Sequence, residues 1–292
     1  MLKLKVPMAA SPQPIKDFLR RQSGISLSAW RSLKNHGQLF INEQAGAFNS
    51  IVCAGDSIVL IWNEECTISP TAIPLDIRFE DDYLLIINKP PGLLVHPTVK
   101  ESTYTLANAI MHYFQQQQLS FTFHPVHRLD RNTSGLILIA KLSHIQHLLS
   151  SDSIKNLKRY YTAIVSGALH PQAGLISAPI GRHPDSIIER VVRSDGQPAI
   201  TRYRTIAAYD TASMIELELL TGRTHQIRVH MAHIGHPLLG DDLYGGSLDQ
   251  LQRQALHAHK LMFIHPITKT AMEITCPLPA DMQLLVDKLQ TG

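Results

Sequence analysis

The 292-residue sequence has few cysteines, no long apolar run and little net charge. Its three cysteines, Cys53, Cys66 and Cys276, are scattered and odd in number. This argues against a disulfide framework and favours a reducing compartment. No apolar run approaches the roughly 20 residues that a membrane helix needs, and the first residues lack the apolar core of a signal peptide. We therefore expect a cytoplasmic protein that makes no contact with a membrane.

Several common enzyme motifs are also missing. The sequence has 16 histidines, but the spacing of His225, His230, His233 and His236 does not match the i, i+4 pair of a zinc peptidase, and H-E-x-x-H does not occur. No segment fits G-x-x-x-x-G-K or G-x-G-x-x-G, the glycine-rich loops that bind phosphate groups. The stretch Asp130–Thr133 lacks the second aspartate of a D-x-D-x-T phosphotransfer loop. We expect no metal site and no aspartyl-phosphate chemistry.

The composition indicates a globular protein whose charge is unevenly distributed. Hydrophobic residues make up 44% of the chain and charged residues 17%, enough apolar surface for a sizeable core. The net charge is +3, yet residues 1–62 alone carry seven basic and three acidic side chains. A basic module on a near-neutral body suggests a polyanionic partner. The alternative is an ordinary solvated helix face.

Residues 1–62 read as two short helices followed by strands. Ile15, Phe18 and Leu19 form a helical stripe, and Ser28 can cap a second helix. This order resembles the small S-four-like RNA-binding domain, which is named for a ribosomal protein. The resemblance implies that Arg31 and Lys34, on the second helix, contact a phosphate backbone.

The rest of the chain reads as a linker and a larger body. Residues 63–75 lack periodicity and contain two prolines, which is typical of a linker. In residues 76–292, strands occur in both hairpin-like and βαβ-like succession, so we predict an α+β fold with a mixed, mainly antiparallel sheet. Strands are expected at 83–88, 137–140, 161–166, 199–207 and 214–219, and helices at 106–114, 143–150 and 224–234.

A carboxylate between two cations marks the most informative segment, His127–Gly135. Asp130 lies between Arg128 and Arg131 and precedes the apolar stretch 136–140. Cations on both sides favour the ionised form that a nucleophile or general base requires. The alternative for such a pattern is a salt-bridged turn.

A second segment, Leu219–His233, contains a buried helical stripe with an arginine beside it. Ile227 and Met231 are four residues apart on that stripe, and Arg228 is one step round from it, near the expected helix start. An arginine in this position can pair with a carboxylate and orient it. A surface ion pair of little energetic value is the alternative.

Five blocks of the chain, His127–Leu136 among them, resemble the RluA-type pseudouridine synthases in sequence and in order. These enzymes isomerise uridine in structured RNA. Block Arg159–Gly167 departs from the family pattern because Arg159 replaces the usual lysine. The other blocks are Ile86–Pro97, Gly222–His230 with its continuation through Asp241 and Tyr244, and Leu256–Pro266.

The resemblance implies a role for each matching residue. Asp130 matches the essential aspartate of the family, Arg228 the basic residue that pairs with it, and Tyr161 the tyrosine that stacks on the extruded base. Arg128 matches an arginine that enters the space the base leaves. His127 supports the same loop and substrate site. Isomerisation needs neither redox change nor group transfer to water, so no cofactor is implied.

Further RNA contacts are expected at Arg223, Arg182 and Arg204. The implied partner is RNA, ribosomal or transfer, and we expect a monomer. Two other functions remain open at this point: a non-catalytic RNA-binding or ribosome-assembly factor with the same fold, and a hydrolase in which water completes a reaction begun by Asp130.

Overall fold

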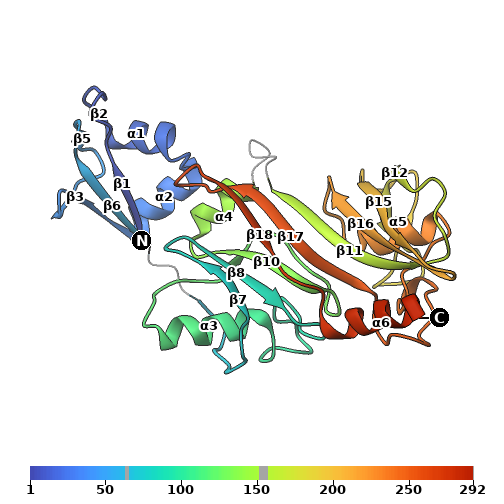
Figure 1. The fold of residues 1–292 in the computed structure, drawn as a ribbon. Helices are drawn as coiled ribbons and strands as arrows, with labels where there is room; N and C mark the ends of the chain where they lie inside the picture. The colour runs from blue at the N-terminus through green and yellow to red at the C-terminus, as the bar shows by residue number, and fades with distance from the viewer. Residues whose placement is uncertain (63–65, 151–156, 292) are drawn as a thin grey trace.

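The computed structural model describes residues 1–62, 66–150 and 157–291 (Figure 1). Its main element is a ten-stranded sheet with the order β12-β15-β16-β11-β17-β10-β8-β7, in which β18 pairs with β17 and β9 with β10. Among the strand pairs of this sheet in the described residues, β10 with β17 is parallel and the others are antiparallel. The expected mixed, mainly antiparallel α+β fold is confirmed. The strands are β7 (Ile77–Glu80), β8 (Leu84–Lys89), β9 (His124–Pro125), β10 (Ser134–Ala140), β11 (Lys158–Ser166), β12 (Ala173–Ser177), β15 (Ile200–Ala208), β16 (Ala212–Leu219), β17 (Leu256–Ile264) and β18 (Ala271–Thr275).

The central strands β8 and β10 are buried on both faces. Ile87 and Ile137 belong to the core beneath helix α3 (Leu106–Gln116). Their neighbours Ile86 and Leu138 belong to a second core on the opposite face. Successive side chains of a strand point to opposite faces, so a strand that is covered on both sides needs apolar residues at every position. This explains why residues 84–87 of β8 and 136–140 of β10 are continuous apolar runs.

The second core includes the N-terminal elements, which lie at one end of the molecule (Figure 1). Trp62 stacks on His144 of helix α4 (Ser143–Ser150), with ring centroids 6.1 Å apart. The His144 Nε2 atom lies 3.0 Å from the Ser23 carbonyl oxygen. The basic module therefore packs against helix α4 at one end of the molecule. Its elements are β1 (Leu2–Lys5), β2 (Gln13–Pro14), α1 (Ile15–Gln22), α2 (Leu27–His36), β3 (Gly37–Ile41), β4 (Gln44–Ala45), β5 (Ile51–Val52) and β6 (Ser57–Trp62).

One capping prediction in this module is wrong. Helix α2 begins at Leu27, and the Ser26 side chain caps it by accepting a hydrogen bond from the Ala29 N–H at 3.1 Å. Ser28 already lies within the first turn. Two serines flank the helix start, and the sequence pattern does not distinguish which of them keeps the extended backbone that an N-cap needs.

The predicted linker packs against the body over most of its length. The Asn108 side chain of α3 donates to the Ser69 carbonyl at 2.7 Å, and the Thr71 N–H donates to the Asn108 carbonyl at 3.1 Å. Ile73 and Leu75 pack on the core beneath α3. Residues 63–65 of the predicted linker lie outside the described residues, and the division into three parts stays a prediction.

Helix α5 (Gln226–His233) is shorter than the predicted 224–234. His225 adopts a left-handed backbone with φ 57°, which ends the helical path at its N-terminus. A hairpin of β13 (Ile180–Arg182) and β14 (Arg190–Val192), a short 3-10 helix (Asp242–Tyr244) and helix α6 (Ala280–Thr291) were not expected from sequence. In the described ranges, every helix is too short or too polar to cross a membrane.

Candidate active site

Three chain segments meet at a cavity on the face of the sheet that shares its core with α3. Asp130 lies on the turn that enters β10, Tyr161 lies on β11, and Arg228 lies in the first turn of α5. All three side chains line this cavity. A larger cleft of about 530 Å³ adjoins it and also contains Asp130 and Tyr161. The structure therefore brings together the three residues that the sequence predicts to be catalytic.

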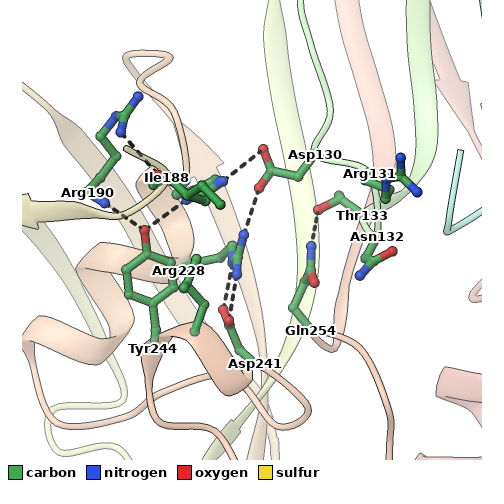
Figure 2. Close-up of polar contacts among 12 residues, drawn as sticks. Asp130, Arg131, Asn132, Thr133, Ile188, Arg190, Arg228, Asp241, Tyr244 and Gln254 are labelled. Carbon is green, nitrogen blue, oxygen red and sulfur yellow. Dashed lines mark hydrogen bonds and ion pairs between the residues drawn. The ribbon is translucent and has the colours of Figure 1, made fainter. Parts of the chain in front are cut away.

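Arg228 contacts two carboxylates, and the tighter contact is to Asp241 (Figure 2). Its Nε and Nη2 atoms each donate to one Asp241 oxygen at 2.7 Å. Its Nη1 atom lies 3.5 Å from Asp130 Oδ2. Burial lowers the pKa of Arg228, but the hydrogen bonds to Asp241 and the charges of both carboxylates outweigh it, so that the pKa is raised overall. Because Asp241 fixes the guanidinium, Asp130 faces a cation without being tightly bound by it.

Tyr161 and His127 are both buried beside Asp130. Burial raises the pKa of the Tyr161 hydroxyl; the charge of Arg159 lowers it and that of Asp130 raises it further. His127 accepts a hydrogen bond at Nε2 from the Leu138 N–H at 3.2 Å, and burial lowers its pKa to about 3. His127 is therefore neutral and supports strand β10.

The turn that carries Asp130 is held by buried side chains from two other segments. Lys89 donates to the Arg131 carbonyl at 2.9 Å, and Arg253 donates to the Asn132 carbonyl at 3.2 Å. Gln254 donates to the Thr133 hydroxyl at 3.2 Å (Figure 2). The turn's backbone is thus fixed, while the Asp130 side chain remains 28% exposed.

The two arginines beside Asp130 have separate surroundings. Arg128 is exposed and lines both the cavity and the larger cleft. Arg131 forms an ion pair with Glu101. The two arginines next to Asp130 in the sequence therefore do not form its ion pair. Its ion-pair partner is Arg228 of α5.

The remaining predicted RNA contacts are spread over the surface. Arg223 lines the cavity and the cleft, and with Arg182 of β13 it also lines a neighbouring cavity. Arg204 lies on the opposite face of the sheet from Tyr161, paired with Glu216. Arg31 and Lys34 are exposed on α2, outside the cavity.

Sequence reasoning assigned no role to three residues around the Asp130–Arg228 pair, namely Asp241, His225 and Tyr244. Asp241 is 1% exposed, and a buried carboxylate needs a cation as its partner. The signal was that Asp241 lies in the continuation of the block Gly222–His230, which resembles the family. Within the described parts of the chain, no cluster of three or more His, Cys, Asp or Glu side chains could hold a metal ion.

The sequence and the fold were compared with known proteins. The family model described as RNA pseudouridylate synthase matches residues 83–233. The Bacillus subtilis protein named as uncharacterized RNA pseudouridine synthase YjbO is 44% identical over 254 residues, covering 86% of this chain and 90% of the relative. Ribosomal large subunit pseudouridine synthase D of Escherichia coli K12 is 40% identical over 242 residues, covering 78% and 74%.

Solved structures share the fold. Human RNA Pseudouridylate Synthase Domain Containing 4 superposes with a TM-score of 0.61 at 24% identity, covering 73% of this chain and 92% of that one. Human RNA Pseudouridylate Synthase Domain Containing 1 gives a TM-score of 0.57, also at 24% identity, covering 78% and 98%. The matching model spans half of the chain and the relatives far exceed chance identity, so this chain belongs to the RNA pseudouridylate synthase family.

Proposed function

We propose that this pseudouridine synthase acts on large-subunit ribosomal RNA, with Asp130 as the nucleophile on a flipped-out uridine. The observation that carries the proposal is the position of the Asp130 carboxylate, partly exposed in a cavity and 3.5 Å from the buried Arg228 guanidinium. The RNA class is supported by the relatives named as ribosomal large subunit pseudouridine synthases.

The proposed chemistry balances without a cofactor. The Asp130 carboxylate attacks ribose C1′ and the bond from C1′ to uracil N1 breaks, leaving the electron pair on the base. The uracil turns, and its C5 attacks C1′ and displaces the carboxylate. The proton on C5 then leaves to solvent, and N1 takes up a proton, which gives neutral pseudouridine. Arg228 favours the charged carboxylate before and after these steps. Tyr161 stacks on the base and takes part in proton transfer.

A uridine in a stem or a stacked loop must leave its stack before Asp130 can reach it. We propose that Arg128 fills the space the base leaves, because a planar guanidinium can stack between neighbouring bases. Its exposure at the mouth of both the cavity and the larger cleft supports this role.

We propose that RNA also contacts basic residues away from the cavity. Arg223 and Arg182 surround the neighbouring cavity and suit phosphate groups of the same strand. Arg31 and Lys34 are the phosphate contacts of the S-four-like module. Arg204 is the weakest candidate because Glu216 already partners its guanidinium.

Tritium release tests the role of Asp130. Total RNA from cells that lack the gene, labelled with tritium at uracil C5, is incubated with excess enzyme. The Asp130→Asn variant keeps the shape and loses the charge, so it should bind RNA but release tritium more than about 1,000-fold slower than the wild-type enzyme. Asp82→Asn, which changes an exposed carboxylate, is the matched control and should retain activity.

The RNA product distinguishes the alternatives. Mapping of the new pseudouridines should place them in large-subunit ribosomal RNA; sites confined to transfer RNA would contradict the proposed substrate. Free uracil in place of pseudouridine would identify a hydrolase. Normal tritium release by Asp130→Asn would end the nucleophile proposal.

A further inference from the structure

His225 lies beside Asp130 but takes no part in the proposed reaction of Asp130, Arg228 and Tyr161. It is the residue before α5, its side chain does not cap the helix, and its ring lines the same cavity as Asp130. The side chain is 12% exposed, and its Nε2 atom lies 3.9 Å from Asp130 Oδ1. The two Asp130 oxygens thus face different partners, since Oδ2 lies near Arg228.

Tyr244 favours one tautomer of the His225 ring. The backbone N–H of Arg190 donates to the Tyr244 hydroxyl oxygen at 3.0 Å (Figure 2). The same oxygen lies 2.8 Å from His225 Nδ1. Because the oxygen already accepts from Arg190, the hydroxyl hydrogen is free to be donated to Nδ1 of His225. A neutral imidazole that accepts at Nδ1 carries its hydrogen on Nε2, the atom that faces Asp130.

The surroundings of His225 favour this neutral form. Burial lowers the pKa of its ring, and the charges of Arg228 and Arg190 act in the same direction. Asp130 and Asp241 oppose the shift without reversing it. The ring therefore offers Asp130 an N–H donor without adding a second full positive charge beside the carboxylate.

Tyr244 also contacts the other partner of Asp130. The Arg228 guanidinium carbon lies 4.9 Å from the centre of the Tyr244 ring, in a cation–π contact. One tyrosine thereby positions the groups that face both Asp130 oxygens. Its hydroxyl is itself fixed by Arg190, the first residue of β14, so the β13–β14 hairpin is part of this arrangement.

We propose that His225 is a positioning residue that donates from Nε2 to Asp130 Oδ1 and fixes the plane of the carboxylate, with Tyr244 holding the required tautomer. Arg228 alone contacts one oxygen and leaves the carboxylate free to turn about its last bond. The 3.9 Å separation shortens when substrate fills the cavity, as the hydrogen bonds of free enzymes commonly do. The inference rests on the proposed role of Asp130.

Two substitutions at His225 separate its two nitrogens. Asparagine tolerates the left-handed backbone of this position. Its amide can reach the position of Nδ1 and keep the contact with Tyr244. It has no donor at the position of Nε2. Glutamine places an amide N–H near the position of Nε2. In the tritium-release assay with excess enzyme, His225→Asn should be about 10- to 100-fold slower than wild type, with its Kd for RNA within about twofold. His225→Gln should recover part of the loss.

Controls show whether the loss is specific. His233→Asn, at the exposed end of the same helix, should keep the wild-type rate. Tyr244→Phe removes the hydroxyl and keeps the ring against Arg228. It should slow the reaction less than His225→Asn does. In the His225→Asn background it should have no further effect, because both changes act on the rate through the same hydrogen bond from His225 Nε2 to Asp130.

The outcomes are distinguishable. A wild-type rate for His225→Asn overturns the inference, and additive losses for the two changes overturn the part assigned to Tyr244. Asp130→Asn is assayed in parallel. If Asp130→Asn is active, the proposed role of Asp130 fails. If Asp130→Asn is inactive and His225→Asn is fully active, only the role of His225 fails.

Discussion

Lys89 is a fully buried lysine behind the turn that carries Asp130. Its three ammonium hydrogens donate to the carbonyls of Pro90, Leu93 and Arg131 at 2.8 to 2.9 Å. Burial is the main cause that lowers its pKa from 10.5 to about 7, against the opposing charge of Asp130. The residue ties the turn to strand β8, and its protonation is linked to folding.

This linkage predicts a pH-dependent stability. Between about pH 7 and pH 10.5 the unfolded chain binds a proton at Lys89 that the folded protein has lost, so raising the pH stabilises the folded state in this window. The contribution rises by up to about 1.4 kcal/mol per pH unit. Urea unfolding of wild type and Lys89→Met at pH 7, 8 and 9 should show this difference in slope. Parallel pH profiles for the two proteins would contradict the prediction.

The sequence predicted single site residues better than their partners. Asp130, Tyr161 and Arg228 could be named because each lies within a recognisable segment of its own. The bidentate Asp241–Arg228 pair could not, since it joins α5 to a loop outside it and depends on tertiary geometry. Nor does the sequence show that Arg131 turns away to Glu101.

Among the elements, the parallel contact between β10 and β17 depends on one glycine. Gly135 has φ 112°, and its Cα is paired with that of Ala258. A Cβ at Gly135 would lie 2.3 Å from the Ala258 carbonyl oxygen and 2.6 Å from its nitrogen. Both atoms belong to the backbone of a buried strand, so neither can move cheaply.

We therefore expect Gly135→Ala to cost at least about 2 kcal/mol of unfolding free energy, from strain in φ and from the clash together. Gly92→Ala is the matched control: Gly92 also has a positive φ, 84°, but a Cβ there meets nothing within 4 Å. Chemical unfolding measures the loss of unfolding free energy in each variant, and the difference between the two losses is the cost of the clash. Equal losses for both would show that the approach to Ala258 is unimportant.

The local sequence pattern predicted which segments form helices or strands. It did not predict several of the residues at which these elements begin or end. The continuous apolar runs of β8 and β10 predicted buried strands correctly. The N-cap at Ser26 and the late start of α5 depend on the backbone angles of single residues, Ser26 and His225. Helix α6 was missed because its buried face, which includes Met282 and Leu285, packs against β11 and the loop before β17 and carries little signal by itself.

At the scale of the whole molecule, three buried histidines make the fold sensitive to acid. Burial is the largest cause that lowers the pKa of His127 to about 3 and the pKa values of His144 and His257 to about 4. Above pH 6.5 these rings are neutral in both states and the stability is complete. Below it, the unfolded chain binds protons that the folded protein does not, so the stability falls.

The unfolding free energy should drop between pH 6.5 and pH 4.5, with each of these histidines contributing up to about 1.4 kcal/mol per pH unit. Urea titrations across this range measure the slope, and His257→Gln should make it shallower. His170→Gln, at an exposed position, is the control substitution. A flat profile between pH 6.5 and pH 5 would contradict the prediction.

The overall fold class followed from the sequence, whereas the packing of its parts did not. The mixed sheet was indicated by the succession of strands. Composition also suggested a separate basic module, but no local pattern indicates that Trp62 stacks on His144 or that residues 69–75 lie against α3. Contacts of this kind depend on where distant surfaces meet.

The two-sided burial of β8 and β10 has a thermodynamic consequence. Helix α4 and the N-terminal elements share the second core with one face of these strands, and α3 covers the other face. Separating the module from α4 would expose apolar side chains of this shared core to water, so we expect the module and the ten-stranded sheet to unfold as one cooperative unit. In that case, RNA that binds to one of the two parts should raise the melting temperature of both.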